Sequence, residues 1–342
     1  MEVKTKKRIK KICLIVIAVL IALALLLAGT YVFMLYRGKS QFHNQDNDIS
    51  VDNKDITVDT DENTVFYKDE AYKLNENIVS VLVMGIDKQS VGDNSYFGQN
   101  GQADSIFVAT VDTDTKKVKI IPIPRETMVD VNVYSKSGVF AETKRQQLCL
   151  AYAYGDTAES SSQNVLRSVR RALYGINISS YITVDLHCVN VLSTKVGGVT
   201  VNCLETLKNT PFVEGKSIKL KGENAVKYIQ ARGDDELGSS RRLARQKQFL
   251  SAFLSTSGNQ ILNDFSMLTK FYNAAQPYIS TDLTFAQITY LASSCLSKDI
   301  GSSIEYADVA GTYTKGQKWM EFEQDEDQMI KTVMETFYVK AE

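Results

Sequence analysis

The sequence predicts a layered α/β/α domain, in which a central mixed sheet lies between helices, preceded by one transmembrane helix. Three observations lead to this fold class. Residues 12–36 carry no charge, short apolar runs typical of buried strands recur from residue 77 onward, and segments of helical periodicity alternate with these runs. The sequence has no internal repeat, so one large domain explains residues 77–342 better than two do.

The predicted transmembrane helix is the run from Ile12 to Tyr36. A helix needs about 20 apolar residues to span a bilayer, so this run is long enough with some tilt. A cleaved secretory signal is the alternative, but its apolar core is usually about 7–15 residues long. Apolar and aromatic residues continue after the small residues Ala28 and Gly29, which favours an uncleaved anchor. No cysteine follows those small residues, so a bacterial lipoprotein anchor is not expected.

Basic residues flank the predicted anchor unequally. Six precede it within residues 4–11, against Arg37 and Lys39 after it. Because the more basic side stays in the cytoplasm, we expect a cytoplasmic tail over residues 1–11 and an extracellular C-terminal part at the cell membrane. Residues 37–76 are rich in Asp, Asn and Glu, which predicts an acidic extracellular linker with room for one short hairpin.

Composition argues against several classes of protein. The net charge of −1 gives no reason to expect nucleic acid as a partner. His43 and His187 are the only histidines, so a histidine-based zinc site or a Ser-His-Asp triad is not expected. The five cysteines have no C-x-x-C spacing, which favours buried free thiols over a disulfide framework.

The extracellular domain, predicted over residues 77–342, opens with strands. Residues 78–85 form an uninterrupted apolar run, as expected for a strand buried on both faces. Residues 105–111 and 118–123 predict two more strands, and the turn sequence between them predicts a hairpin.

Helices and strands then alternate, which predicts helices packed on a sheet. Further strands are expected over residues 181–184 and 198–202. Helices are expected over residues 158–174, 186–195, 222–231, 239–256, 283–297 and 325–337. The region after residue 253 carries few chemical signals, and Trp319 is expected to pack in the domain, with glycan stacking as the alternative.

Carboxylates stand at the ends of two predicted strands. Asp87 follows the strand at 78–85, and Asp104 precedes the strand at 105–111. Ligands of open α/β sheets gather at strand ends, and two carboxylates there suit a hard cation such as Mg²⁺. Capping of a turn is the alternative role at each position. Arg125, after the next strand, is expected to face the same crevice.

The second candidate segment, residues 232–246, is rich in arginine. Helical spacing puts Arg242 and Gln246 on the face that carries aromatic residues farther along. A buried guanidinium is costly unless it is paired or bound to an anion. A solvated basic helix end is the alternative. With Arg232 and Arg125 nearby, the segment suits a phosphate or pyrophosphate, which arginine binds through two N–H groups.

Eight motifs in consistent order, over residues 78–253, identify a resemblance to the LytR-CpsA-Psr family of bacterial cell-envelope proteins. The motifs are VLVMGID with Asp87, GQADS with Asp104, PIPRET with Arg125, AYAYGD at 151–156, YITVDL at 181–186, GGVTVN at 197–202, YIQARGD at 228–234 and RLARQ at 242–246. Each motif is weak alone. Together, in this order, they are specific.

The resemblance implies an extracellular phosphotransferase. Members of the family transfer a phosphoglycan, such as wall teichoic acid or capsular polysaccharide, from a polyprenyl-pyrophosphate carrier to peptidoglycan. The implied fold has a central sheet between helices and an apolar channel for the polyprenyl chain. No nucleotide is needed, because the pyrophosphate bond supplies the driving force.

The resemblance also implies roles for individual residues. Asp87 and Asp104 match the aspartates that bind Mg²⁺. The residues that contact pyrophosphate are matched by Arg125, Arg232, Arg242 and Gln246. Among all of these, the residues expected to be catalytic are Asp104, Arg125 and Arg242.

This chain departs from the family at three positions expected to contact pyrophosphate. Gln102, Gln147 and Gln230 stand where basic residues are usual, and Ser239 stands where an acidic residue is usual. A charged hydrogen bond contributes about 1.5–3 kcal/mol against about 1 kcal/mol for a neutral one. Two interpretations therefore stay open: a transferase with altered donor preference, or a weak member that binds polyprenyl-linked glycan as a scaffold or regulator. The retained aspartates and arginines favour the transferase.

Overall fold

The computed structural model describes most of the chain after residue 63 and two shorter segments before it. The described residues are 28–42, 56–59, 64–87, 91, 97–231, 238–296, 304–316 and 318–341. They belong to two compact units, one formed by residues 1–45 and 284–293 and the other by residues 46–283 and 294–342. All the predicted site residues fall within the larger unit.

The smaller unit contains a helix over residues 28–42 and most of α7 (Phe285–Cys295). These two helices approach closely at Gly38, where a Cβ atom would overlap the backbone oxygen of Ala286. The close contact between the helices therefore requires glycine at this position.

The predicted tail, residues 1–11, and the start of the predicted transmembrane run, residues 12–27, lie outside the described residues. Within the part of the chain that the structure describes, no helix has the length and apolar character needed to cross a membrane.

Part of the predicted linker is folded. A four-stranded sheet has the order β1–β2–β3–β16. Its strands are β1 (Ile56–Asp59), β2 (Thr64–Tyr67), β3 (Glu70–Leu74) and β16 (Tyr338–Lys340). β1 and β2 form the short hairpin for which the sequence left room. The larger unit therefore begins before residue 77, because Val65 of β2 is fully buried in its core.

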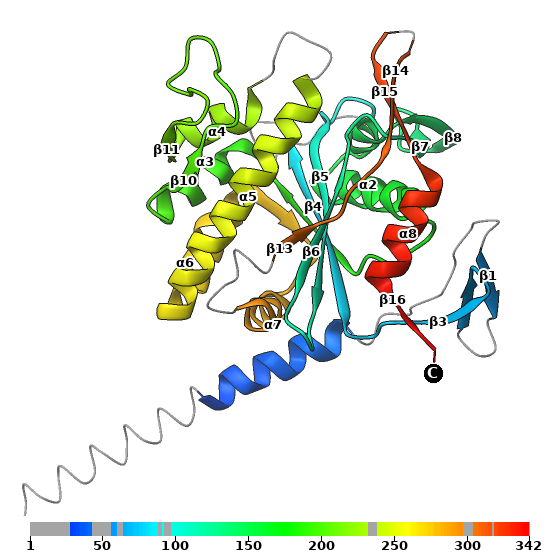
Figure 1. The fold of residues 1–342 in the computed structure, drawn as a ribbon, viewed down its shortest axis with the longest axis horizontal. Helices are drawn as coiled ribbons and strands as arrows, with labels where there is room; N and C mark the ends of the chain where they lie inside the picture. The colour runs from blue at the N-terminus through cyan, green and yellow to red at the C-terminus, as the bar shows by residue number, and fades with distance from the viewer. Residues whose placement is uncertain are drawn as a thin grey trace, which may run out of the picture. The chain divides into compact units, whose positions relative to one another are not determined.

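A six-stranded sheet forms the centre of the larger unit (Figure 1). Its strands, in spatial order, are β12 (Ile279–Thr281), β9 (Ser180–Val184), β4 (Ile78–Ile86), β5 (Ala103–Asp112), β6 (Val118–Ile123) and β13 (Ile304–Tyr306). β4, β5 and β6 pair antiparallel, whereas β9 joins β4 and β13 joins β6 in parallel. The predicted mixed sheet is confirmed.

Helices cover both faces of this sheet, as predicted. In Figure 1, α2 and α8 lie on one side, and α3, α4, α5 and α6 lie on the other. Their bounds are α2 (Ala158–Ala172), α3 (Leu186–Lys195), α4 (Glu223–Gln230), α5 (Gly238–Asn263), α6 (Ser266–Ala275) and α8 (Glu326–Phe337). At the starts of α2, α3 and α8, the side chains of Thr157, Asp185 and Asp325 accept hydrogen bonds from backbone N–H groups of the first helical turn.

Among its described residues, the larger unit also contains three two-stranded ribbons and two 3₁₀ helices. The ribbons pair β7 (Met128–Tyr134) with β8 (Phe140–Gln147), β10 (Val199–Asn202) with β11 (Ser217–Leu220), and β14 (Gly311–Lys315) with β15 (Met320–Gln324). The 3₁₀ helices are η1 (Leu148–Tyr154) and η2 (Gln276–Tyr278). The strand predicted over 198–202 is confirmed as β10, but it pairs with β11 and stays outside the central sheet.

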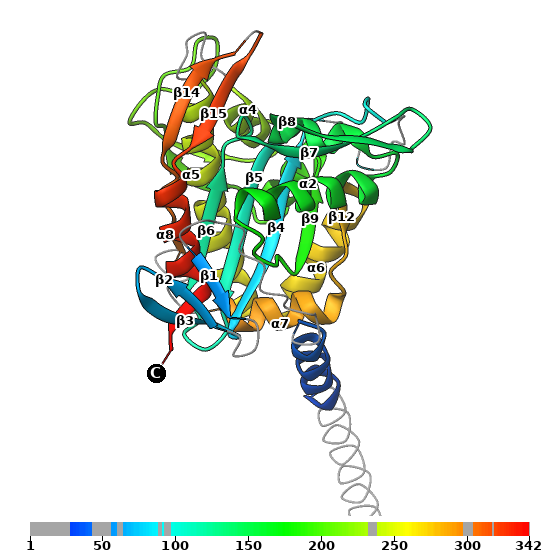
Figure 2. The ribbon, with the colours of Figure 1, turned by 90° about the vertical axis from the view of Figure 1, so that its right-hand side faces the viewer.

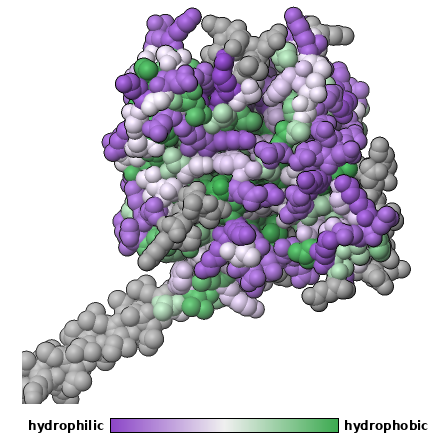
Figure 3. All heavy atoms as spheres, viewed as in Figure 1, coloured by the Kyte–Doolittle hydropathy of each residue, from purple (hydrophilic) through white to green (hydrophobic). Residues whose placement is uncertain are grey.

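The two faces of the central sheet differ in packing. Leu82 and Met84 of β4, with Ile106 of β5, are buried in the core that includes α2 and α8. The alternate residues Val83 and Phe107 face a cavity on the side of α4 and α5. On the outer surface seen in Figure 3, hydrophilic residues predominate. The apolar lining of the cavity comes from β4 and β5 of the sheet and from α3, α4 and α5 beside it.

Candidate functional site

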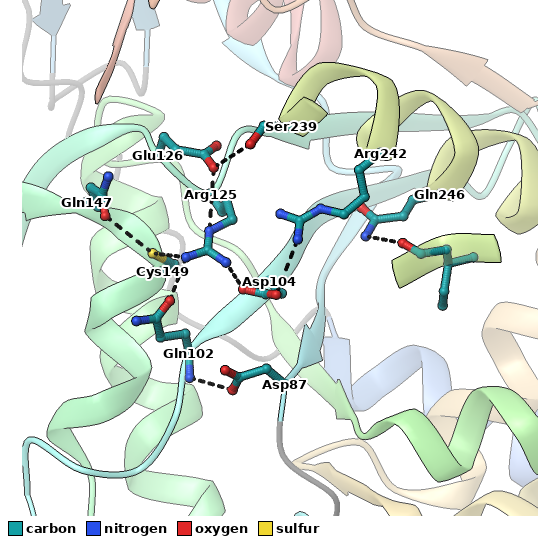
Figure 4. Close-up of polar contacts among 11 residues, drawn as sticks. Asp87, Gln102, Asp104, Arg125, Glu126, Gln147, Cys149, Ser239, Arg242 and Gln246 are labelled. Carbon is teal, nitrogen blue, oxygen red and sulfur yellow. Dashed lines mark hydrogen bonds and ion pairs between the residues drawn. The ribbon is translucent and has the colours of Figure 1, made fainter. Parts of the chain in front are cut away.

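Arg125, directly after β6, lies at the centre of the candidate site (Figure 4). Its terminal nitrogens contact the carboxylate of Asp104 and, at 2.5 Å, the amide oxygen of Gln102. Its Nε lies 3.6 Å from the carboxylate of Glu126. Burial acts to lower the pKa of Arg125, but the acidic groups around it raise the pKa overall, so the side chain is a cation.

Asp104 lies between two arginines. One of its oxygens contacts Arg125, and the other lies 3.4 Å from NH1 of Arg242. Arg242 comes from the first turns of α5 and is only 4% exposed. The predicted burial of Arg242 is confirmed, and Asp104 is the partner that a buried guanidinium requires. This pairing joins the start of β5, the end of β6 and α5.

Asp87 lies on the other side of Gln102. Its carboxylate accepts the backbone N–H of Gln102 at 2.9 Å, so it closes the connection between β4 and β5. Asp87 also lines the same cavity as Asp104. Both the turn role and a ligand role are therefore compatible with its position.

The residues present fit a magnesium ion that is shared with a ligand. In the described part of the chain, no three His, Cys, Asp or Glu side chains are grouped to hold a metal by themselves. Mg²⁺, however, is often held by one or two carboxylates together with substrate phosphates. The carboxylates of Asp87 and Asp104, which line one cavity, provide such a set.

The cavity next to these residues has a volume of about 330 Å³. Near the strand ends its lining is polar, with Asp87, Asp104 and Arg242. Deeper along the strands and α5 the lining is apolar, with side chains that include Val83, Phe107, Val189, Ile229, Phe249 and Leu250. A ligand with a charged head and an apolar tail matches this lining.

The other predicted contact residues differ in position. Gln230 and Gln246 line the cavity, and Gln246 donates to the backbone oxygen of Ile229 at 3.4 Å. Gln147 instead donates to the backbone oxygen of Met320 at 2.6 Å. Arg232 lies outside the described residues. The structure thus brings together Gln102, Asp104, Arg125 and Arg242, with Gln147 at the margin.

Glu126 is a site residue that the sequence prediction missed. It is only 8% exposed, and its carboxylate accepts a hydrogen bond from Ser239 Oγ at 3.0 Å while lying beside Arg125. An acidic residue at position 239 was expected from the resemblance. Here position 239 is a serine, and the carboxylate that it contacts belongs to Glu126, which follows β6. The sequence did contain a signal for Glu126, because it directly follows Arg125 in the PIPRET motif.

Cys149 contributes a neutral thiol beside Arg125. Its sulfur lies 3.5 Å from NH2 of Arg125 and is buried. Burial raises the pKa of the Cys149 thiol from 9.0 to about 11, against the opposing effect of Arg125. The thiol is therefore protonated at neutral pH and contributes no negative charge to the site.

This raised pKa predicts a loss of stability in alkaline solution. The folded state keeps the Cys149 proton up to about pH 11, whereas the unfolded state loses it near pH 9. The thiol's contribution is thus complete below about pH 9 and is lost as the pH rises toward 11. In urea unfolding at successive pH values, Cys149→Ala should show a smaller decline over this range than the parent chain. Equal declines in both proteins would contradict the prediction.

Arg245 is a second residue that the prediction missed. It is fully buried, and its guanidinium contacts the backbone oxygens of Tyr228 and Ala231 and the carboxylate of Glu205. Glu205 also lies 3.4 Å from Arg241. These contacts fix the end of α4 to α5. Arg245 thereby fixes the C-terminal end of α4 against α5.

Comparisons with known proteins show the family to which the chain belongs. A model of the LytR_cpsA_psr family matches residues 32–336. A polyisoprenyl-teichoic acid–peptidoglycan teichoic acid transferase, TagU, of Bacillus licheniformis is 27% identical over 291 residues, which cover 83% of this chain and 82% of TagU. TagU of Bacillus subtilis is 24% identical over 315 residues, with 91% and 90% covered.

A solved structure shares the fold. The crystal structure of Bacillus subtilis TagV superposes with a TM-score of 0.59 at 24% identity. The match covers 77% of this chain and 98% of TagV. The mixed α/β fold with its central sheet is therefore common to both proteins.

Proposed function

Since the chain belongs to the LytR-CpsA-Psr family, we propose that it transfers a phosphoglycan from a polyprenyl-pyrophosphate carrier to a hydroxyl group of peptidoglycan. One observation carries the proposal: an apolar cavity opens beside the carboxylate of Asp104, which is held between Arg125 and the buried Arg242. The polyprenyl chain would occupy the apolar part, and the pyrophosphate would lie against Arg125 and Arg242. The names of the relatives support both the donor and the acceptor.

The reaction is a phosphoryl transfer. An acceptor hydroxyl oxygen attacks the phosphorus nearer the glycan, the bond from that phosphorus to the bridging oxygen breaks, and polyprenyl phosphate leaves with the electron pair. The hydroxyl proton passes to solvent. Catalysis of this kind depends on positioning and on stabilising charge. Arg125 and Arg242 serve both needs, because Asp104 holds their guanidinium groups in fixed positions.

A divalent cation would complete the charge balance. Three carboxylates, from Asp87, Asp104 and Glu126, lie near two arginines, so these residues carry no positive excess to offset a pyrophosphate. Asp87 and Asp104 would hold Mg²⁺, which supplies neutralising charge to the pyrophosphate when bound. Because three basic residues are replaced by glutamines, we expect this dependence on Mg²⁺ to be strong.

The proposal includes the location of the enzyme. The uncharged run at 12–36 would anchor the chain, with the basic tail in the cytoplasm and the site outside. That side of the membrane holds peptidoglycan and lacks nucleotides, which fits a donor that carries its own pyrophosphate.

Turnover tests this function directly. The full-length protein in detergent is incubated with Mg²⁺, a polyprenyl-pyrophosphate-linked saccharide and peptidoglycan oligomers, and release of polyprenyl phosphate is followed. We expect release that Asp104→Ala and removal of Mg²⁺ both abolish, whereas Arg167→Gln, an exposed arginine on α2, has no effect. Absence of release with every donor tried would refute the transferase.

A second function rests on the amide contacts. The Gln102 side chain accepts from Arg125, and the Gln147 amide donates to the backbone of Met320, so neither supplies positive charge to a ligand. This arrangement favours a chain that binds polyprenyl-linked glycan as a scaffold or regulator. Binding of the lipid-linked donor without turnover is the result that distinguishes it.

Restoring the three charges tests what the glutamines do. The combined change Gln102→Arg, Gln147→Arg and Gln230→Arg should increase the rate or the donor affinity about tenfold or more, because each charged hydrogen bond is stronger than a neutral one. Initial rates and lipid binding are measured on the same protein, with Arg167→Gln again as the control. If neither quantity changes, the glutamines are not an adaptation of this site.

A further inference from the structure

The β14–β15 hairpin is attached to the candidate site. The backbone N–H of Phe322 donates to the oxygen of Glu126 at 3.0 Å, and Thr127 forms a β-bridge with Phe322. Gln147 donates to the oxygen of Met320. In Figures 1 and 2 the hairpin projects at the end of the sheet where β4 ends, which is the end that carries Asp87.

Trp319 lies in the loop of this hairpin and is 72% exposed. The expectation that it packs in the domain is therefore wrong. It is the only tryptophan in the chain, and it directly precedes Met320, whose oxygen holds Gln147. An exposed indole offers a large, rigid, flat apolar face. Such a face suits stacking against the C–H groups of a sugar ring.

A polar cavity of about 420 Å³ lies beside the other end of β15. Its charged and phenolic lining residues are Asp130, Arg145, Arg171, Tyr174, Glu323 and Glu326. Arg145 and Glu323 form an ion pair at its edge. Because both signs of charge are present, the cavity suits a ligand that carries ammonium and carboxylate groups together.

The same two strands connect these features. β8 contributes Gln147 and Arg145, and β15 contributes their partners Met320 and Glu323. From Trp319 to Gln324 an extended strand covers roughly 16 Å. Three features therefore follow one another along β15: the exposed indole of Trp319, the hydrogen bond from Gln147 to Met320, and the polar cavity. Together they extend over about the length of a small glycopeptide.

We propose that the β14–β15 hairpin and the polar cavity beside it bind the acceptor, with Trp319 stacked on a sugar ring and the cavity holding the charged stem peptide. The identity of the acceptor as peptidoglycan rests on the proposed function. The arrangement explains how an acceptor hydroxyl reaches the donor, because Gln147 and Glu126 link the hairpin to the residues around Arg125.

The single tryptophan makes binding directly observable. The full-length protein without donor is titrated with a disaccharide of N-acetylated amino sugars, either bare or carrying its stem peptide, and tryptophan emission is recorded. We expect a saturable blue shift with both ligands and roughly tenfold tighter binding of the glycopeptide. Arg171→Gln should remove most of this difference, and Phe66→Ala, an exposed aromatic on β2, should leave it unchanged.

Emission that responds to neither ligand would overturn the proposal, and equal affinity for both would overturn the role of the cavity. This assay needs no turnover, so binding without transfer would reject the proposed function and keep the hairpin site.

In the transfer assay, Trp319→Ala should raise KM for the acceptor roughly tenfold without changing KM for the donor. Trp319→Tyr should restore most of the affinity for the acceptor. An unchanged acceptor KM in Trp319→Ala would reject the indole contact.

Discussion

Arg125→Ala is expected to lower the rate of phosphoglycan transfer by about 10²–10³-fold, the usual effect of removing one fixed donor that stabilises developing charge. The guanidinium of Arg125 is held by Asp104, Gln102 and Glu126. It therefore needs no reorganisation when negative charge develops on the transferred phosphoryl group. The measurement is release of polyprenyl phosphate under single-turnover conditions, which separates chemistry from product release.

Arg125→Lys sharpens this test. Lysine keeps the charge but loses the planar fork that contacts two partners at once. We expect an activity between those of the parent chain and Arg125→Ala. If Arg125→Ala retains most of the parent rate while remaining folded, Arg125 is a structural ion-pair partner, and the proposed mechanism fails. Far-UV circular dichroism and the unfolding midpoint show whether the variant is folded.

Much of this site was predictable from local sequence. Asp87 and Asp104 adjoin β4 and β5, whose apolar runs are evident without a structure, and strand ends are where α/β sheets hold ligands. Helical spacing correctly predicted that Arg242 and Gln246 face one side, since both line the cavity. Short-range periodicity carries enough information for these positions.

The remaining features depend on contacts between distant segments. The hydrogen bond from Gln147 to Met320 joins residues 173 positions apart, and no local pattern signals it. β14 and β15 have no apolar run that would predict a strand, although the ring centroids of Tyr313 and Phe322 lie 4.8 Å apart across the hairpin. The prediction for Trp319 failed for the same reason, since burial of one aromatic residue depends on the whole fold.

The carboxylate at Glu126 shows how a lost residue can be replaced in space. Ser239 removes an acidic side chain from the start of α5, yet its hydroxyl donates to the buried Glu126 carboxylate. A carboxylate is therefore supplied beside Ser239 and Arg125 by the residue that follows Arg125 after β6. This charge also affects Tyr313, whose pKa is raised to about 12 by burial and by Glu126, while Arg242 opposes the shift. Tyr313 is accordingly neutral at physiological pH.

Arg245→Met is expected to destabilise the larger unit by about 3–5 kcal/mol, the usual cost of removing one partner from a buried charged pair. Methionine fills similar volume, so the loss would come from polar contacts. The backbone oxygens of Tyr228 and Ala231 and the carboxylate of Glu205 would each lose a donor. Urea unfolding of the full-length protein in detergent gives the change in free energy.

The neighbouring Arg241 provides a matched control. It contacts the same Glu205 carboxylate at 3.4 Å, but its side chain is 40% exposed. Arg241→Met should therefore cost less than about 1 kcal/mol, as for most exposed ion pairs. Equal losses of unfolding free energy in the two variants would show that the fully buried contacts of Arg245 stabilise the protein no more than the exposed ion pair of Arg241. A large loss confined to Arg245→Met, with transfer activity reduced even where the variant is folded, would identify Arg245 as the residue that positions the end of α4 against α5.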